Sequence, residues 1–164
     1  MKNLIVSYDQ KRGIGKENDL LWQRDLQADL QHFKKLTTGN AIIMGRITFF
    51  FDLKERLLPN RQTIIVSRQS TTVPGATVVS SMKEAYAAVQ PGKQPFVIGG
   101  GEIFRQAIHD VDRMYVTEVA TTADADVSFP EFSLDDWQEV SREHHTADER
   151  NKYAYDFVVF DRRR

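Results

Sequence analysis

The chain has 164 residues, a formal net charge of −1 and a sequence pI of about 6.4, so it carries no overall basic field that favours nucleic acid or an anionic membrane. It contains no cysteine, which rules out disulfides, thiolate metal sites and cysteine nucleophiles. Hydrophobic residues make up 41% of the chain and charged residues 27%, as in an ordinary globular protein, and the length suits one domain, which we expect to cover residues 1–164.

The first predicted elements alternate between strand and helix. "NLIVSY" (Asn3–Tyr8) is typical of a short apolar strand. Apolar residues then recur at helical spacing, at Leu26, Leu30, Phe33 and Leu36. "AIIMG" (Ala41–Gly45) and "TIIVS" (Thr63–Ser67) are β-rich runs bounded by polar or turn residues, which predicts two buried strands.

The next segments repeat this alternation. Thr77–Val79 predicts a strand, and Ser81–Val89 predicts a helix with Ser81 as its N-cap and Glu84 at the capping-box position. "FVIGGG" (Phe96–Gly101) begins a second such unit. Its helix carries four apolar residues at helical spacing, Ile103, Phe104, Ala107 and Ile108.

Strands and loops then close the chain, with strands predicted at Arg113–Val119 and Ala154–Phe160. This order predicts an α/β fold, in which helices flank a mostly parallel sheet and the C-terminal part adds an antiparallel edge. Ligands of such sheets bind at the carboxyl ends of the strands. The opening residues meet an acid too early for a secretory signal, and no apolar run is long enough to cross a bilayer, so we expect a cytoplasmic protein without a membrane partner.

Two glycine clusters fail the dinucleotide fingerprint. Phe104 and Asn18 stand where "GGGEIF" and "GIGKEN" would need their third glycine. A strand that runs into Gly99–Gly101 and then a helix still suits phosphate binding, and a simple strand-to-helix turn explains the same pattern equally well. Arg46 and Ser67–Arg68 follow two predicted strands, and together with the glycine turn they favour an anionic ligand.

The stretch "WQRDLQADLQHFKK" holds two Asp-Leu pairs, at Asp25 and Asp29. A carboxyl group held against an apolar pocket has a raised pKa and can act as an acid near neutral pH. At 100° per residue, Asp29 lies about 50° from the apolar stripe of the helix and Asp25 about 90°. Asp29 is therefore the candidate acid, and Asp25 is interpreted as a cap or loop charge.

Other polar residues are interpreted as surface groups. His32 projects opposite the apolar stripe, and the adjacent His144 and His145 lack metal-ligand spacing. The terminal "DRRR" is typical of a frayed, solvated tail.

Short motifs follow one another along nearly the whole chain: "GIGKENDLLW", "DLQHFK", "MGRITF", "LPNR", "IIVSR", "VIGGGEIF", "MYVTEV" and "DADVSFPEF". In this order they resemble the motifs of bacterial dihydrofolate reductase. Asp29-Leu30 with Phe33-Lys34 matches that family's D-L-x-x-F-[KR], which selects Asp29 over Asp25 independently of the helical wheel. The resemblance implies a three-layer fold around an eight-stranded, mostly parallel sheet with an antiparallel C-terminal edge strand. It also implies reduction of 7,8-dihydrofolate to tetrahydrofolate by NADPH.

On the cofactor side, the resemblance implies that Arg46, Ser67 and Arg68 meet the adenosine 2′-phosphate, a basic, hydroxyl-bearing pocket that favours NADPH over NADH. The glycine turn would pass close to the pyrophosphate and nicotinamide, with a cis peptide bond at Gly99–Gly100. The full set of implied cofactor-binding residues is Ile14, Asn18, Gly45, Arg46, Thr48, Ser67, Arg68, Gly99, Gly100, Gly101 and Glu102.

On the substrate side, the resemblance implies that Asp29 anchors the pterin and favours protonation of its ring nitrogen through an ordered water. Trp22 would help hold that water, and Thr117 would support the acid through water. Arg61 would pair bidentately with the glutamate α-carboxylate. The apolar residues implied to line the pterin and aminobenzoyl pockets are Ile5, Val6, Leu30, Phe33, Leu58 and Ile98.

Two segments depart from the family pattern. "WQRDLQAD" is two residues longer than the usual W-x-L-P-x-[DE] and has Gln27 in place of the proline. "FFDLKERLLP" (Phe50–Pro59) replaces roughly E-S-[IFM]-G-x-x-L-P and is also longer. We expect four of its apolar residues to continue a helix and refill the pocket wall, namely Phe50, Phe51, Leu53 and Leu57. A compensated frameshift in the gene is a second explanation of this segment.

Two other functions stay open at this point. One is a related pyrimidine or pteridine reductase on the same fold, which would need a phosphate site where Arg61 awaits a carboxylate. The other is a non-catalytic NADPH- or folate-binding protein, disabled by the altered segment. The resemblance also implies a monomer.

Overall fold

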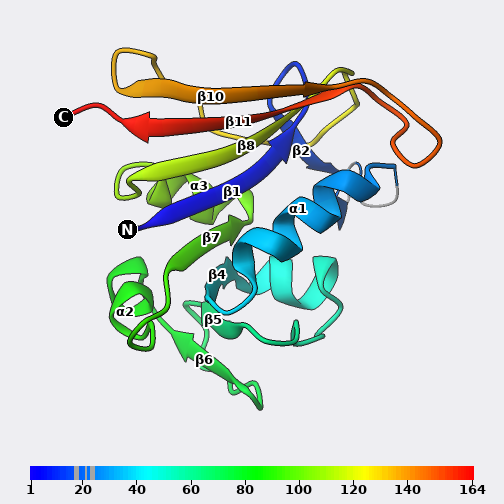
Figure 1. Ribbon diagram of the computed structural model, residues 1–164. Coiled ribbons are helices and arrows are strands. Elements are labelled where there is room, and N and C mark those ends of the chain that lie inside the picture. The colour runs from blue at the N-terminus through cyan, green and yellow to red at the C-terminus, as the bar shows by residue number, and fades with distance from the viewer. Residues whose placement is uncertain (17–18, 21, 23–24) are drawn as a thin grey trace.

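The structure, a computed structural model, describes residues 1–16, 19–20, 22 and 25–164 (Figure 1). Asn18, predicted to contact the cofactor, lies outside the described residues. The strands of the main sheet are β1 (Asn3–Tyr8), β4 (Ala41–Gly45), β5 (Gln62–Val66), β6 (Ala76–Val79), β7 (Pro95–Gly99), β8 (Arg113–Val119), β10 (Trp137–His145) and β11 (Tyr155–Arg162). A second, small sheet contains β2 (Gly13–Lys16), β3 (Asp19–Leu20) and β9 (Val127–Ser128) in the order β3-β2-β9.

The main sheet has the order β10-β11-β8-β1-β7-β4-β5-β6. Strand β11 is antiparallel to both of its neighbours, β8 and β10, whereas the other neighbouring pairs of this sheet are parallel. The predicted eight-stranded, mostly parallel sheet with an antiparallel C-terminal edge is therefore confirmed. The strand that reverses direction lies one position in from the edge, which β10 occupies.

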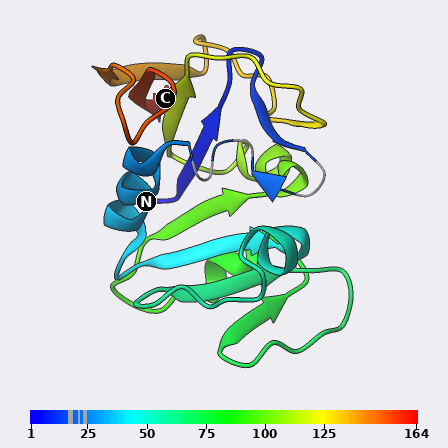
Figure 2. The same cartoon turned by 90° about the vertical axis from the view of Figure 1, so that its right-hand side faces the viewer.

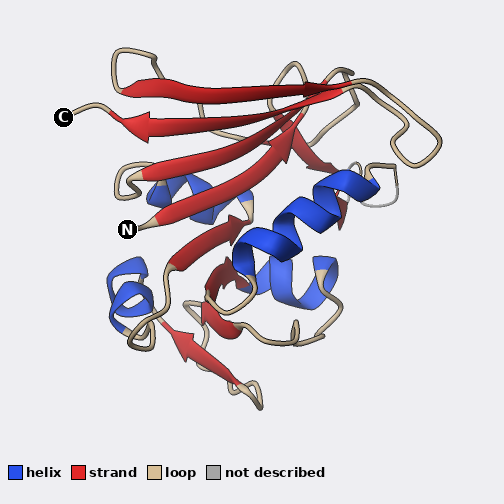
Figure 3. Cartoon of the chain, viewed as in Figure 1, coloured by secondary structure: helices blue, strands red, loops and turns tan. Residues whose placement is uncertain are grey.

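Helices cover both faces of the sheet, as Figure 2 and the secondary-structure colouring of Figure 3 show. Helix α1 (Gln27–Thr37) and the π-helical turn η1 (Thr48–Asp52) pack on one face. Helices α2 (Met82–Ala87) and α3 (Gly101–Ala107) pack on the other. None of the described helices is both long and apolar enough to cross a membrane.

The central strands are apolar on both sides because both faces of the sheet are covered. In β4, Ile42 and Met44 join the core beneath α1 and η1, whereas Ile43 joins the core beneath α2 and α3. All five residues of β4 are buried. This explains why the strand appears in the sequence as a continuous apolar run rather than an alternating one.

The start of α2 follows the predicted capping pattern with one shift. The Ser81 hydroxyl accepts a hydrogen bond from the Glu84 N–H at 3.1 Å, as an N-cap does. The Glu84 carboxylate, however, accepts from the N–H and hydroxyl of Ser80, at 3.1 and 3.0 Å, and not from the N–H of the N-cap residue. The bond back from Glu84 therefore reaches Ser80, one residue before the N-cap, instead of the predicted Ser81.

The C-terminal arginines are held by the fold, so the prediction of a frayed tail is wrong. Arg162 donates to the carbonyls of Ile108 and Val111, at 2.6 and 2.9 Å, just beyond the end of α3. Arg164 pairs with Asp112 at 2.6 Å. A guanidinium group satisfies the unpaired carbonyls at a helix end and interacts favourably with the helix dipole, which a tail of solvated charges would not do.

Candidate functional site

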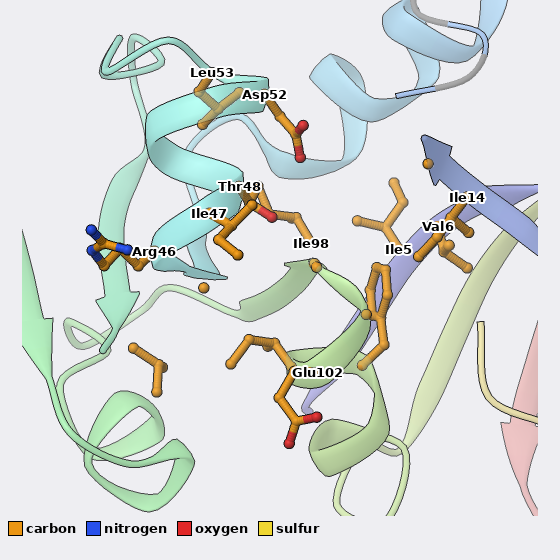
Figure 4. Close-up of a pocket in the computed structure, with 18 of the residues that line it drawn as sticks. Ile5, Val6, Ile14, Arg46, Ile47, Thr48, Asp52, Leu53, Ile98 and Glu102 are labelled. Atoms are coloured by element: carbon orange, nitrogen blue, oxygen red, sulfur yellow. The ribbon is translucent and has the colours of Figure 1, made fainter. Parts of the chain in front are cut away.

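A cleft opens where β1 separates from β7. The two strands pair only through Asn3 and Leu4, opposite Phe96 and Val97, whereas β1 pairs with β8 along its full length. The carboxyl ends of β1 and β7 therefore diverge, and the cleft between them has a volume of about 1260 Å³ (Figure 4). This exceeds the usual range of roughly 300–1000 Å³ for one small ligand, so the cleft has room for two ligands side by side.

The predicted acid, Asp29, lies in the first turn of α1 and lines this cleft. The Thr117 hydroxyl of β8 donates to Asp29 Oδ1 at 2.6 Å, a direct contact rather than the predicted one through water, because β8 brings the hydroxyl within bonding distance of the carboxyl group. Ser7 of β1 also hydrogen-bonds the carboxyl group. Burial raises the pKa of Asp29 above its ordinary value, against the opposing effect of the two hydroxyls. The carboxyl group is thus desolvated and held by hydroxyls rather than paired with a cation, which favours its protonated form.

Thr117 and Trp22 lie behind the cleft rather than in it. Thr117 is buried and reaches the cleft only through Asp29. Trp22 is buried against Tyr153, with ring centroids 6.3 Å apart in an edge-to-face arrangement. Its indole N–H has no hydrogen-bond partner within the described part of the chain. A buried polar group of this kind commonly pairs with an ordered water, the role that the resemblance gives to this tryptophan.

The wall beside Asp29 is apolar. All the apolar side chains predicted for the substrate lie along it, from β1, α1, β7 and the loop before β5: Ile5, Val6, Leu30, Phe33, Leu58 and Ile98. Leu30 is 45% exposed although it belongs to the apolar stripe of α1, because it faces the open cleft instead of the core. Figure 4 shows Ile5, Val6 and Ile98 among the side chains that line the cleft.

Arg61 lies at the outer end of the same wall and is already oriented. Its Nε donates to the Pro59 carbonyl at 2.9 Å, and Nη1 donates to the Thr37 hydroxyl at 3.2 Å. Thr37 in turn donates to the Phe33 carbonyl at 2.8 Å. The guanidinium group is therefore fixed against the last turn of α1, and it lines the cleft, where a carboxylate of a ligand can reach it.

The opposite end of the cleft carries the predicted phosphate-binding residues. Arg46 and Arg68 are exposed there, and Ser67, which directly follows β5, is buried and lines the cleft. The Ser67 hydroxyl donates to the Gln69 carbonyl at 3.1 Å. Arg46 lies over the Phe50 ring, 5.5 Å from its centroid. Two cations and a hydroxyl at the ends of two parallel strands form a donor set that suits a phosphate group.

The glycine turn after β7 forms the middle of the cleft, with Gly45 at the end of β4 facing it. The peptide bond between Gly99 and Gly100 is cis, as the resemblance implies. Gly99 has φ of +131°, which side chains rarely tolerate, and a Cβ on Gly101 would lie 2.7 Å from Val127 Cγ1. The buried Thr48 packs against this turn. Bare backbone therefore faces the cleft, where a ligand can approach it closely.

Two further predicted cofactor residues differ in how they meet the cleft. Ile14 of β2 is buried and lines it. Glu102 in the first turn of α3 also lines it, but its carboxylate accepts hydrogen bonds from Arg105 at 2.9 and 3.1 Å and from Gln106 at 3.3 Å. These contacts hold the pKa of Glu102 below its ordinary value, so it is an anion committed to its own helix.

The atypical segment, Phe50–Pro59, is helical only up to Asp52, where η1 ends. Its apolar side chains refill the pocket wall only in part. Phe50 and Leu53 pack against the core beneath α1, and Leu53 lines the cleft. Phe51 is 51% exposed and Leu57 is 42% exposed, so the expectation for these two residues is wrong. In η1 the chain forms a π-helical turn, which accommodates an extra residue in a helix and rotates the side chains that follow.

The structure also brings residues to the cleft that the sequence did not indicate. Ser7 reaches Asp29 from β1, because in that strand it shares a face with Ile5. The same alternation in "NLIVSY" was the available signal. Four charged residues also line the cleft without having been predicted: Lys34, Asp52, Arg56 and Arg105. Asp52 and Arg56 belong to the atypical segment, which departs from the family pattern and therefore has no matching positions there.

The comparisons with known proteins agree with this geometry. The family model described as "Dihydrofolate reductase" matches residues 1–162. The dihydrofolate reductase of Bacillus subtilis (strain 168) is 40% identical over 164 residues, covering 99% of this chain and 95% of the relative. Dihydrofolate reductase type 3 of Salmonella typhimurium is 36% identical, covering 99% of this chain and 98% of the relative.

A solved structure, dihydrofolate reductase from Enterococcus faecalis complexed with NADP(H) and RAB-propyl, superposes with a TM-score of 0.91. It is 33% identical in sequence, and the match covers 100% of this chain and 97% of that one. With the divided sheet, the desolvated carboxyl group and the two-ligand cleft, these matches lead to one conclusion: the chain belongs to the dihydrofolate reductase family.

Proposed function

We propose that the protein reduces 7,8-dihydrofolate to 5,6,7,8-tetrahydrofolate with NADPH, and that Asp29 is the carboxyl group that supports proton transfer to the substrate. The observation that carries the proposal is the desolvated Asp29 in the same cleft as the apolar wall and the glycine turn, in a chain of this family. We also infer that the protein works as a monomer, as the resemblance implies, and that it acts in the cytoplasm, as expected from the sequence.

The residues at one end of the cleft fit NADPH. Arg46, Ser67 and Arg68 offer charge and hydroxyl donors to a 2′-phosphate, whereas the 2′-hydroxyl of NADH would call for a carboxylate acceptor. The open backbone of Gly99–Gly101 offers close approach to the remainder of the cofactor. When bound, NADPH supplies the hydride for reduction of the substrate's C=N bond.

The apolar wall and Arg61 would hold and orient dihydrofolate. Leu30, Phe33 and Leu58 offer apolar contacts to its aromatic linker. Arg61, already fixed by Pro59 and Thr37, offers its remaining N–H groups to a glutamate carboxylate. Both contacts would place the pterin against Asp29 with little loss of side-chain freedom on binding.

Asp29 would act on the pterin edge. One carboxylate can accept two hydrogen bonds from an amino-amide edge and thereby favour protonation of the adjacent ring nitrogen. Thr117 and Ser7 orient the carboxyl group, and the unpartnered Trp22 N–H is suited to hold the water through which the proton passes. Desolvation raises the pKa of this carboxyl group above that of a solvated aspartate, which is the direction that such a role requires.

The direct test is a turnover assay. The purified protein is mixed with NADPH and dihydrofolate, and the loss of nicotinamide absorbance is followed. We expect turnover, and we expect Asp29→Asn to lower kcat/KM at pH 7 by at least about a hundredfold, since positioned proton transfer contributes roughly 10²–10⁴. The residual activity of this variant should rise as the pH falls, because solvent protonates the substrate more readily.

The same assay separates the alternatives. NADPH binding without turnover on any pterin or pyrimidine substrate would indicate a non-catalytic binder. Turnover of a phosphorylated pyrimidine but not of dihydrofolate would indicate the related reductase. An Asp29→Asn variant with full activity at pH 7 would remove the acid assignment while leaving the family assignment intact.

A further inference from the structure

The helix that carries Asp29 has no cap of its own. Its N-cap residue is Leu26, whose side chain has no hydrogen-bonding atom, so the first N–H groups of α1 need acceptors from elsewhere. The Ala28 N–H donates to Asn151 Oδ1 at 2.9 Å, and the Gln27 N–H donates to the Arg150 carbonyl at 3.3 Å. Both acceptors lie in the connection between β10 and β11.

Asn151 is built to fill this role. It is buried, with 5% of its surface exposed, and Asp148 Oδ1 accepts from its backbone N–H at 2.8 Å and from its side-chain Nδ2 at 3.0 Å. Because Nδ2 is committed to Asp148, the amide oxygen faces α1. An antiparallel bridge between Leu26 and Asn151, and a 2.7 Å bond from the Lys152 N–H to the Asp25 carbonyl, hold the two segments together.

This arrangement answers one of the sequence departures. Where the family usually has proline, at the first position of this helix, the chain has Gln27. Proline has no N–H group at a position where the N–H would be unpaired. Glutamine adds a donor that must be satisfied, and the carbonyl of Arg150 accepts from it. The β10–β11 connection thus supplies what the substituted residue requires.

We propose that Asn151 is a positioning residue for the reaction, which caps α1 from a distant loop and thereby holds Asp29 in its hydrogen bond with Thr117. Asp29 directly follows Ala28, whose N–H donates a hydrogen bond to Asn151 Oδ1. Fraying of this first turn would therefore move the Asp29 carboxyl group away from Thr117. The role in catalysis rests on the proposed function, whereas the positioning of the carboxyl group does not.

The test compares Asn151→Ala with a matched control on the same helix. Asn40 also hydrogen-bonds α1, through Nδ2 to the Leu36 carbonyl at 3.2 Å, but at the C-terminal end, away from Asp29. Asn40→Ala therefore removes a bond from the same helix without touching the first turn. Like Asn151→Ala it also removes a bond to a loop, since Asn40 Oδ1 accepts from the Gln94 N–H at 3.0 Å. Asn151→Ser keeps an oxygen acceptor of the kind favoured at N-caps.

Two readouts distinguish positioning from general stability. The first is the pH profile of kcat/KM, which reports the ionisation of the free enzyme. The second is the titration of the Asp29 carboxyl carbon by NMR in the full chain, which needs no turnover. Tyr155 of β11 interacts electrostatically with Asp29, but its pKa is raised, so it stays neutral through the acidic range of both measurements.

We expect Asn151→Ala to lower kcat/KM at pH 7 by about two- to thirtyfold, the range that corresponds to loss of an N-cap. We expect it to move the Asp29 titration towards lower pH, because a freed carboxyl group is better hydrated. Asn151→Ser should recover part of both effects, and Asn40→Ala should leave the titration midpoint unchanged.

Three outcomes would overturn the proposal. One is an Asp29 titration that is the same in Asn151→Ala and the unaltered chain. Another is an equal shift in Asn40→Ala, which would indicate a general loss of helix stability. If Asn151→Ala does not fold, the folded Asn151→Ser variant replaces it in the test. An Asn151→Ser variant whose kcat/KM is as low as that of Asp29→Asn would then contradict the proposal. Absence of turnover in every variant with the NMR shift intact would instead count against the proposed function alone.

Discussion

At the scale of single residues, the site is defined by one unfavourable environment. Asp29 lies at a helix N-terminus, where the helix dipole favours its anion, yet burial among apolar side chains raises its pKa. Desolvation dominates because the contacts that lower the pKa are two neutral hydroxyls rather than a cation. A group held in this way reduces the stability of the fold when it ionises, and this has a measurable consequence.

Replacement of Asp29 by asparagine should stabilise the unliganded protein at neutral pH. The unfolded chain releases the Asp29 proton near pH 4, before the folded chain does, so this residue's contribution to stability falls as the pH rises from about 4 through the raised folded-state pKa. An asparagine side chain does not ionise, so the variant lacks this loss. We expect urea unfolding at pH 7 to show Asp29→Asn as the more stable protein, with the difference vanishing near pH 3. A variant less stable than the unaltered chain at pH 7 would contradict the assignment of desolvation as the dominant cause.

Arg61 illustrates geometry rather than charge. Its hydrogen bonds to Pro59 and Thr37 fix the planar group, and lysine can reproduce the charge but not the fork. We expect Arg61→Lys to raise KM for dihydrofolate by about tenfold or more, with kcat nearly unchanged, because uniform binding is lost. Steady-state kinetics check this, and the KM for NADPH, which should not move, is the internal control. An equal loss in kcat would place Arg61 in the chemical step instead.

At the scale of elements, the sequence anticipated those whose burial pattern is simple. β1, β4 and β8 have the predicted bounds because runs of β-branched and apolar residues end sharply at polar or turn residues. β10 was not anticipated, since seven of its nine residues are exposed and its charged sequence resembles a loop. Such charges suit an edge strand, where they discourage pairing with other chains. A helix was expected to continue through Phe50–Leu57, and η1 ends at Asp52; its π-helical form was not anticipated, because no hydrophobic period marks it.

His32 shows how tertiary contact overrides a helical wheel. The wheel placed it on the surface, but its ring stacks on Phe157 of β11, with centroids 4.0 Å apart and planes 14° apart. Strand β11 reaches around α1 and covers part of the face that the wheel treats as solvent. The adjacent histidines were likewise taken as solvated, yet His145 stacks on Tyr155 at 4.9 Å and meets the edge of Phe157 at 5.3 Å.

The stack makes the α1–β11 contact sensitive to acid. Burial lowers the pKa of His32, so its neutral form is the one that the fold favours. The contribution is fully present above the unfolded-state pKa of about 6.5 and is lost as the pH falls through the lower folded-state value. We expect His32→Phe, which keeps a ring against Phe157, to lose less thermal stability between pH 7 and pH 5 than the unaltered chain.

The control for this measurement is the exposed His109, whose replacement by glutamine should leave the acid-induced loss of stability as it is. If His32→Phe and the unaltered chain lose the same stability on acidification, the stack is not the acid-sensitive contact.

At the scale of the whole molecule, the C-terminal strand joins parts that are far apart in sequence. Arg162 at the end of β11 binds the carbonyls beyond α3 and lies over the Trp137 ring, 4.4 Å from its centroid. We expect Arg162→Ala to destabilise the protein by about 1–3 kcal/mol, the range for hydrogen bonds to a charged group. For a chain of this length that lowers Tm by roughly 3–10 °C.

Calorimetry checks this, and Arg163→Ala is the matched control. Arg163 donates to the Leu134 carbonyl at 2.8 Å from an exposed position, and its loss should lower Tm by far less. Equal effects would mean that burial at Arg162 contributes nothing.

Because β11 is the last strand of the chain, its place beside α1 determines when during synthesis the site becomes complete. Every residue predicted to bind substrate or cofactor, from Ile5 to Thr117, leaves the ribosome before Asn151 and Phe157 do. Domains fold as synthesis proceeds. The first turn of α1 obtains its acceptor, Asn151, only when the β10–β11 connection is made, and His32 obtains Phe157 only when β11 is made. A nascent chain that stops short of β11 therefore holds all the ligand-binding residues, including the Thr117 that bonds Asp29, but the helix that carries Asp29 still lacks the partners of its first turn, so we expect full turnover only from the finished chain.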